Sequence, residues 1–440
     1  MSKDELTEPS PEDVARCLAV LRAVESLPDD HPVRLTVERA ATQVQRGMKK
    51  RLRRERGLAT RRANSALVQS LQQARHEEHG VRRLPASTGT DTPLHVSRAK
   101  RCYVCKGPYT RLHPVYVSLC PACAELSAAR RGQHVSLQGR RALVTGGRVK
   151  VGFHVALRLL RAGALVHVTS RFPRDAASRF EQQPDFSQWR ERLVLHGLDL
   201  RYPQRVLDFA QALGATEPHL DILINNAAQT VRLGPAQHAA LLAGEHEHAR
   251  TLAAGTLALV RELPGAPEAP LLPAGAEAPP APNAWKLKLD EVPPVELLEA
   301  QLVNAIAPFL LNGRLKALLL RAPSPDRYIV NVSAVEGQFE RGSKREFHPH
   351  TNMAKAALNM MTRTSAEDYA RDGIFMNSVD PGWISNENPE PLRRRLEEEG
   401  FSPPLDGADA AARVCDPILQ GVQGRPVYGR FLKDFREVPW

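Results

Sequence analysis

Alternating strands and helices are predicted for the C-terminal two thirds of the chain. Short apolar runs typical of buried strands occur at 141–145, 164–169, 194–198, 220–224, 328–332 and 375–379. Between them lie segments with helical spacing of apolar residues, at about 150–162, 293–320 and 351–371. This repetition predicts an α/β fold with a doubly wound parallel sheet, whose ligand crevice lies at the carboxyl ends of the strands.

One stretch interrupts the repetition. Residues 231–292 lie between the fourth predicted strand and the helix that carries Asn304, and they include seven prolines within 264–282. Proline without periodicity is typical of an exposed, partly extended loop. The loop leaves the sheet on its ligand side, so we expect either a lid or partner contact, or a disordered insertion.

The N-terminal region is predicted to be helical. The segment Ser10–Asp13 (SPED) combines a hydroxyl cap, a proline at the first helical position and acids in the first turn. A second helical stretch begins near Val33, and a turn-rich segment covers 85–93. We therefore divide the chain into an α-helical basic region (1–84), a linker (85–100), a four-cysteine module (101–137) and an α/β domain (138–440).

Positive charge is concentrated in the N-terminal third. The net charge is +11; residues 1–141 hold 26 Lys/Arg against 14 Asp/Glu, whereas residues 142–440 hold 34 against 35. This split excludes a general nucleic-acid-binding role for most of the chain. We expect the basic segment 46–62 to dock on an acidic protein or on nucleic acid, or to be a solvated arm. It contains no aromatic residue, so stacking onto bases is not supported.

Four of the six cysteines form two C-x-x-C pairs. Cys102 and Cys105 are separated by fourteen residues from Cys120 and Cys123. This spacing suits one tetrahedral Zn²⁺ with four thiolates, which leaves no open position and makes the metal structural. The short module lacks a core of its own, so the metal would supply much of its folding energy. The alternatives are reduced cysteines in a loop or two disulfides.

Residues that carry chemistry follow several predicted strands. They are the glycine-rich turn Thr145–Gly152, Asp199, Asn226 and Ala227, Asn304 and Lys355 on helices, and Pro381 and Gly382 after the sixth strand. Glycines let backbone amides approach a pyrophosphate at a helix N-terminus. At these spacings the set resembles the short-chain dehydrogenase/reductase family over about residues 138–440, apart from the insertion. The resemblance implies a Rossmann-type fold that binds NAD(P)(H).

The resemblance also implies a role for each residue. Thr145, Gly146, Gly147 and Gly152 would form the pyrophosphate turn, and Asp199 would hold the adenine amine. Asn226 and Ala227 would brace the ribose and the central strand, and Lys355 would bind the nicotinamide ribose. Asn304 would hold a water of the proton relay, and Pro381 and Gly382 would complete the cofactor site. Members that select NAD have an acid after the second strand. This chain has Arg171 there, and a guanidinium suits a 2′-phosphate. Arg171, helped by Arg148, therefore favours NADP(H) over NAD(H).

Departures from the family pattern affect the catalytic residues. Lys150 stands where the family has the second glycine of the turn. Thr351 stands at the position of the family's catalytic tyrosine, and Ala334 at that of its serine. An aliphatic hydroxyl is too weakly acidic to replace a phenol. Ser333 lies one place before the serine position, so it is expected to face the other way. Of the two histidines just before Thr351, we take His350 as the candidate proton donor.

Two functions are consistent with this pattern. The first is an NADP(H)-dependent oxidoreductase with a remodelled proton donor, acting on a small-molecule substrate. The second is an inactive family member that senses a dinucleotide or serves as a scaffold, without a substrate, and binds an acidic partner through its N-terminal region. The resemblance makes a homo-oligomer an expectation. The start of the chain lacks a signal-peptide pattern and neither long apolar stretch is free of charge, so we expect a cytoplasmic protein without a membrane span.

Overall fold

The computed structural model describes residues 8–440 except 74–75, 79–80, 84–93, 231–234, 264–283, 341–343, 386–389 and 399–400. The chain forms two compact units. One comprises Met1–Ser70 with Val96–Ala99, and the other Leu71–His95 with Lys100–Trp440. The second unit holds residues 100–137, which include the four cysteines, and the α/β domain, so contacts between these two parts belong to one body.

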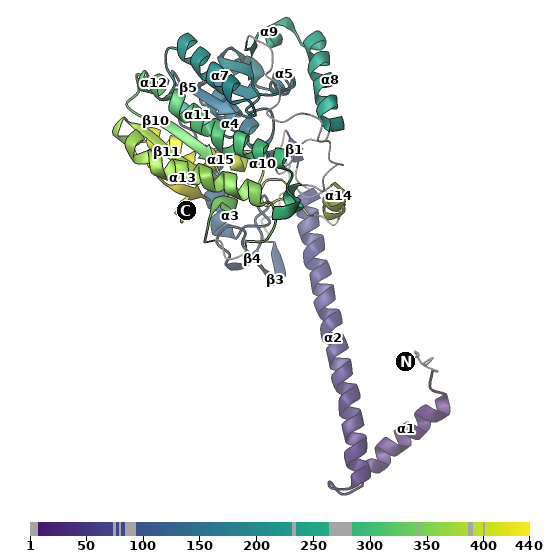
Figure 1. The fold of residues 1–440 in the computed structure, drawn as a ribbon. Coiled ribbons are helices and arrows are strands. Elements are labelled where there is room, and N and C mark those ends of the chain that lie inside the picture. Colours follow the sequence, from purple (N-terminus) through teal and green to yellow (C-terminus); the bar gives the residue numbers. More distant parts are fainter. Residues whose placement is uncertain are drawn as a thin grey trace. The chain divides into compact units, whose positions relative to one another are not determined.

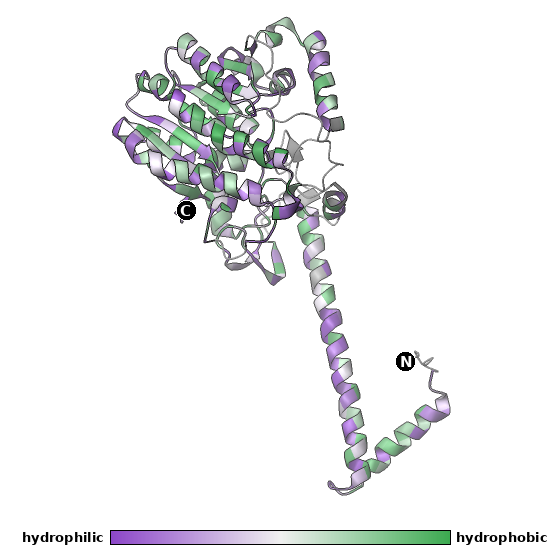
Figure 2. Ribbon diagram, in the orientation of Figure 1, coloured by the Kyte–Doolittle hydropathy of each residue, from purple (hydrophilic) through white to green (hydrophobic). Residues whose placement is uncertain are grey.

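Two helices make up most of the first unit: α1 (Pro11–Val24) and α2 (Pro32–Gln73). Ser10 begins α1 with a capping box, in which its Oγ accepts a hydrogen bond from Asp13 N at 3.2 Å. Hydrophilic residues run along much of α2 (Figure 2), and the described basic side chains between 46 and 62 are exposed. The expected docking of this segment on an acidic partner stays a prediction.

The predicted mostly parallel sheet is confirmed (Figure 1). Its six predicted strands are β5 (Arg141–Thr145), β6 (Leu165–Ser170), β7 (Leu193–Gly197), β8 (Ile222–Asn225), β10 (Arg327–Val332) and β11 (Ile374–Asp380). Three short strands extend it: β9 (Val260–Glu262), β12 (Phe431–Lys433) and β13 (Arg436–Val438). The order is β13-β12-β11-β10-β8-β5-β6-β7-β9, and only β13 pairs antiparallel. The crossover between β5 and β8 produces the crevice at which such sheets bind ligands.

Both faces of the sheet are covered, which explains the continuous apolar runs of its central strands. On β5, Ala142 and Val144 face one core cluster whereas Leu143 faces the other. The first cluster is closed by α4 (Lys150–Arg161), α5 (Pro173–Glu181) and α15 (Gly407–Val422). The second is closed by α7 (Pro203–Thr216), α11 (Ala307–Arg314), α12 (Lys316–Leu320) and α13 (Pro349–Arg371).

The insertion is folded over much of its length. Residues 235–262 form α8 (Pro235–Thr251), α9 (Ala254–Leu257) and β9, which pairs in parallel with β7. The carboxylate of Glu245 accepts hydrogen bonds from Arg174 N and Asp175 N at the start of α5. The expectation of a loop is therefore wrong for this part, because an edge strand and a helix-capping carboxylate fix it to the domain. The proline-rich part at 264–283 lies outside the described residues.

The remaining elements of the domain are short: α6 (Phe186–Trp189), α10 (Pro294–Gln301), α14 (Glu390–Glu398), the 3₁₀ turns η1 (Arg190–Arg192), η2 (Ala284–Lys286), η3 (Leu289–Glu291) and η5 (Val335–Gly337), and the π-helical turn η4 (Leu302–Ile306). The stretch Pro294–Arg314 passes a length and hydropathy test for a membrane span. Half of its apolar window is buried inside the domain, as in the core helix of a folded domain.

The four-cysteine module consists of β3 (His95–Arg101), β4 (Pro108–Arg111) and α3 (Pro121–Gly132). The end of the expected linker at 85–100 is thus a strand, and 84–93 lies outside the described residues. Helix α2 ends at Gln73, and β1 (His76–Glu78) pairs with β2 (Val81–Arg83), so the expected helical region of 1–84 ends in a hairpin.

Candidate active site

The glycine-rich turn after β5 is fastened to the turn after β8. The Nδ2 of Asn226 donates to Thr145 O and Gly146 O at 3.0 and 3.1 Å, and Thr145 Oγ1 accepts from the backbone amides of Asn226 and Ala227 at 3.0 Å each. Gly146 has a φ of +66°, and a Cβ there would lie 2.8 Å from Ala227 Cα. At Gly152 a Cβ would lie 2.4 Å from Gly146 O. The predicted glycine-rich turn is therefore formed, and its geometry needs both glycines.

Two arginines lie beside this turn. The guanidinium groups of Arg148 and Arg171 lie 5.4 and 5.7 Å from the ring centroid of Phe172, on which both stack. Arg148 also pairs with Asp175, at 2.6 Å between Nη1 and Oδ2. Arg171 is exposed. The structure thus brings together the two cations that the sequence assigned to a 2′-phosphate.

Asp199, which was predicted to hold the adenine amine, forms an ion pair with a residue that the sequence analysis missed. Arg201 holds the Asp199 carboxylate through its Nε and Nη2, the latter at 2.6 Å, and its Nη1 reaches Glu299 at 3.1 Å. Glu299 in turn accepts from Gln229 Nε2 at 2.6 Å. Charge-assisted pairs of this kind fix the position of the carboxylate. Glu299 is remote from Asp199 and Arg201 in the sequence, and only the fold brings it to the carboxyl ends of the strands.

Asn304 lies in the π-helical turn η4, a local distortion that often marks functional sites. Both ends of its amide bond the loop after β8: Oδ1 accepts from Gln229 N at 2.7 Å, and Nδ2 donates to Gln229 O at 3.0 Å. In this structure Asn304 therefore holds the loop that follows Asn226 and Ala227. Its predicted part in a proton relay stays a prediction.

Lys355 lies one turn after Thr351 on α13 and donates from Nζ to Val332 O, at the end of β10, at 2.8 Å. Burial lowers the pKa of Lys355 to about 8, against the opposing effect of the Glu336 and Asp380 carboxylates. A lysine with this pKa is close to its titration point at neutral pH, unlike an ordinary surface lysine.

At the tyrosine position, the Thr351 hydroxyl donates to His348 O at 2.9 Å and lies 3.2 Å from Nδ1 of His348. His348 has a φ of +44° and stacks on Trp285, with ring centroids 4.0 Å apart. His350 is 2% exposed, both of its ring nitrogens lack a hydrogen-bond partner, and burial lowers its pKa. The structure thus brings His348, rather than the predicted His350, into contact with Thr351.

The serine position offers no hydroxyl to the site. Ala334 is extended, with φ and ψ of −162° and 162°. The Oγ of the preceding Ser333 is buried and makes no hydrogen bond. Neither residue therefore replaces the missing serine.

The turn after β11 is organised by Asp380. Its Oδ1 accepts from Gly382 N at 2.7 Å, and its Oδ2 accepts from Val335 N at 3.1 Å and from Lys433 Nζ at 2.6 Å. The carboxylate therefore joins the loops that follow the adjacent strands β10 and β11. This arrangement places the predicted Pro381 and Gly382 at the carboxyl edge of the sheet.

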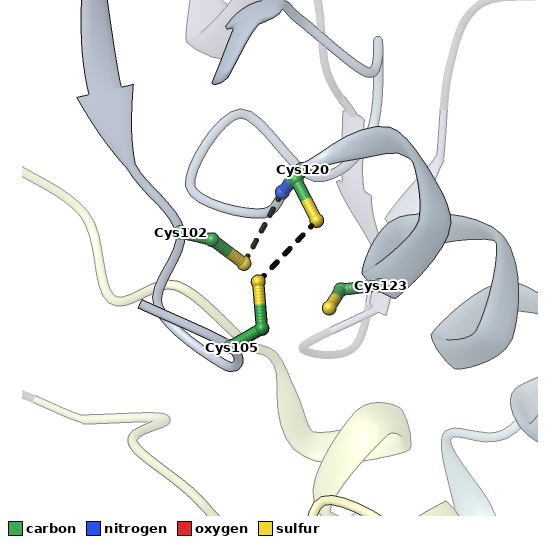
Figure 3. Close-up of side chains that lie close together, drawn as sticks. All are labelled: Cys102, Cys105, Cys120 and Cys123. Carbon is green, nitrogen blue, oxygen red and sulfur yellow. Dashed lines mark hydrogen bonds between the residues drawn. The ribbon is translucent and has the colours of Figure 1, made fainter. Parts of the chain in front are cut away.

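The four cysteines converge, as Figure 3 shows: their Sγ atoms all lie within 4.8 Å of one another, and the sulfurs of Cys105 and Cys120 are 3.7 Å apart. The Sγ of Cys102 accepts from Cys120 N at 3.3 Å. A hydrogen bond from the Gly107 backbone lowers the pKa of Cys105 to about 7, with help from the thiols of Cys102 and Cys120. Thiolate, the form that binds metals, is thus favoured at Cys105.

Two family models match the α/β domain: "short chain dehydrogenase" over residues 140–248 and "Enoyl-(Acyl carrier protein) reductase" over residues 281–399. The gap between them falls within the insertion. An uncharacterised protein of Acanthamoeba polyphaga mimivirus is 32% identical over 342 residues, which cover 72% of this chain and 71% of that protein. The chain therefore belongs to the short-chain dehydrogenase/reductase family.

Two further similar proteins have described names. The rhamnolipids biosynthesis 3-oxoacyl-[acyl-carrier-protein] reductase of Pseudomonas aeruginosa is 25% identical, over 67% of this chain and 87% of that enzyme. A short chain dehydrogenase from Burkholderia cenocepacia, solved in complex with NADP, is 21% identical with a TM-score of 0.47, over 68% of this chain and 97% of that one. The family membership makes the chain an oxidoreductase-type protein.

The depressed pKa of Lys355 predicts a pH dependence of stability. Between about pH 8 and the ordinary value of 10.5, the unfolded chain keeps a proton that the folded protein has released. The free energy of unfolding should therefore rise with pH across this window, and Lys355→Met should remove that rise. Urea unfolding at both ends of the window measures this rise. If the free energy of unfolding changed with pH equally in both proteins, the lowered pKa could not belong to Lys355.

Proposed function

We propose that the protein is an NADP(H)-dependent oxidoreductase whose proton donor has been remodelled. The observation that carries the proposal is the fastened glycine turn with Arg148 and Arg171 beside it and Lys355 on α13. Gly146, Gly147 and Gly152 would hold the pyrophosphate, and Lys355 the nicotinamide ribose. The bound cofactor would supply or accept a hydride.

Cofactor preference tests the arginine pair. Arg171→Ala should weaken NADPH binding by roughly tenfold or more, because a hydrogen bond to a charged group contributes about 1.5–3 kcal/mol. NADH binding should be unchanged, since NADH has no 2′-phosphate. Isothermal titration calorimetry gives both dissociation constants, and Arg190→Ala, an exposed arginine elsewhere on the domain, is the control. Equal affinities of the unmodified protein for NADPH and NADH would refute the preference.

The proton donor is proposed to be His348 acting through the Thr351 hydroxyl. A half-buried imidazole exchanges protons with water, and its Nδ1 is within hydrogen-bond distance of Oγ1 of Thr351. In the relay, the Thr351 hydroxyl turns its proton from His348 O to the substrate and takes a proton from Nδ1 of His348, so threonine does not ionise and its high pKa is no obstacle. His350, the candidate from the sequence, is buried, and burial lowers its pKa, which disfavours the protonated form that a proton donor needs.

Matched variants separate the two histidines. His348→Asn and Thr351→Val should each lower kcat by about 10²-fold and remove the same limb of its pH profile, because both break one relay. His350→Asn should leave that limb in place. The assay follows NADPH oxidation with a panel of ketones, 3-oxoacyl thioesters and enoyl thioesters. Loss of the limb in His350→Asn alone would return the role to His350.

The four cysteines are proposed to bind one structural Zn²⁺. A tetrahedral ion about 2.3 Å from each sulfur separates the sulfurs by about 3.8 Å, close to the observed Cys105–Cys120 distance of 3.7 Å. Two of the ligands, Cys102 and Cys123, are buried, which shields the ion from solvent. The ion would supply folding energy and no open coordination position.

Metal analysis tests this site directly. The purified protein should contain one zinc per chain, and acidification should release it, because protons compete for the thiolates. Cys102→Ser should abolish stoichiometric zinc, whereas Cys17→Ser, an exposed cysteine far from the cluster in sequence, should not. Zinc-free protein with an unchanged unfolding midpoint would argue against a structural metal.

A further inference from the structure

The four-cysteine module contacts the α/β domain beside its expected cofactor crevice. The phenol oxygen of Tyr103, inside the first C-x-x-C pair, accepts a hydrogen bond from Trp383 N at 2.9 Å. Tyr103 N donates to Ser118 O at 2.8 Å, so the backbone that carries the phenol is held within the four-cysteine module. Trp383 directly follows Pro381 and Gly382. The module therefore reaches the turn that Asp380 organises.

A second set of contacts holds the start of α15. The Tyr116 hydroxyl donates to Asp409 Oδ1 at 2.6 Å, and Arg131 Nη1 lies 2.9 Å from Asp406 and 3.3 Å from Asp409. Asp406 is the N-cap of α15 and is 3% exposed, and Asp409 is 1% exposed. Buried carboxylates need such partners, because an unpaired buried charge is strongly destabilising.

These two sets of contacts lie at the two ends of one segment. Trp383 and Asp406 bound it, and Leu405 N donates to Trp383 O at 3.3 Å, so the ends also touch each other. Within it, the rings of Trp383 and Phe401 pack with centroids 5.3 Å apart. The module thus contacts both ends of this segment, at Trp383 and at Asp406.

We propose that Tyr103 is a positioning residue for the nicotinamide end of the cofactor site. The metal-bound module acts through Tyr103 as a clamp on Trp383, and through Tyr116 and Arg131 it holds the start of α15. A clamp at this end leaves the adenine end alone, since Arg148, Arg171 and the glycine turn make none of these contacts. The inference rests on the proposed NADP(H) function. It adds that binding of the cofactor depends on the cysteine cluster.

Two tyrosines of the module give a matched pair. Tyr103→Phe removes the bond to Trp383, whereas Tyr109→Phe removes a bond to Val117 O, at 2.7 Å, within the module. The full-length protein is titrated with NADPH and with adenosine 2′,5′-bisphosphate, which carries the 2′-phosphate but no nicotinamide. Tyr103→Phe should raise the NADPH dissociation constant roughly two- to tenfold, the value of one hydrogen bond, and leave bisphosphate binding unchanged. Tyr109→Phe should change neither.

A second readout is independent of nucleotide binding. Amide hydrogen exchange at 383–385 and 401–406 should be faster in Tyr103→Phe, and after removal of the metal by a chelator, than in the unmodified protein or Tyr109→Phe. Equal exchange in all samples, or equal loss of affinity for both nucleotides in Tyr103→Phe, would overturn the clamp. If the unmodified protein binds neither nucleotide, the proposed function fails, and the exchange data alone decide whether the clamp exists.

Discussion

The close approach of two backbone turns, after β5 and after β8, is the constraint on which the site depends. The Asn226 amide donates to two successive carbonyls of the glycine turn, and the space left between the turns does not admit a Cβ at Gly146 or Gly152. Because these strands are the central pair of the crossover, their fastening fixes where α4 begins. The helix N-terminus, the adjacent arginines and the loop held by Asn304 are all placed relative to this junction.

Much of the sheet was predictable because its central strands are buried on both faces. Such strands are continuous apolar runs, and all six expected ones exist within a residue or two of the expected bounds. The three edge strands are only three residues long and show no periodicity, so no pattern marks them. Helix α8 consists largely of good helix formers, Ala, Leu and Glu, but the prolines that follow it favoured a loop.

The candidate site, like the sheet, was predictable from the sequence only in part. The glycine turn, Asp199, Asn226 and Lys355 were found because each follows a strand or helix at a fixed spacing. His348 could not be preferred over His350, since its contact with Thr351 depends on a left-handed backbone at His348, which sequence does not display. The contact of Tyr103 with Trp383 joins residues 280 positions apart and has no local signal at all.

Lys150 shows how the turn accommodates its most unusual residue. Its φ of +52° is the left-handed conformation that a glycine adopts without strain, and an L-residue there costs about 1–2 kcal/mol. The backbone of a glycine turn is therefore kept, and a cation is added at the first residue of α4, where the helix dipole is already positive. Arg148, which pairs with Asp175, and the exposed Arg171 lie beside this turn on the ring of Phe172. Two planar guanidinium groups beside the turn suit the 2′-phosphate of the proposed NADP(H) ligand, since arginine binds phosphate oxygens in a bidentate manner.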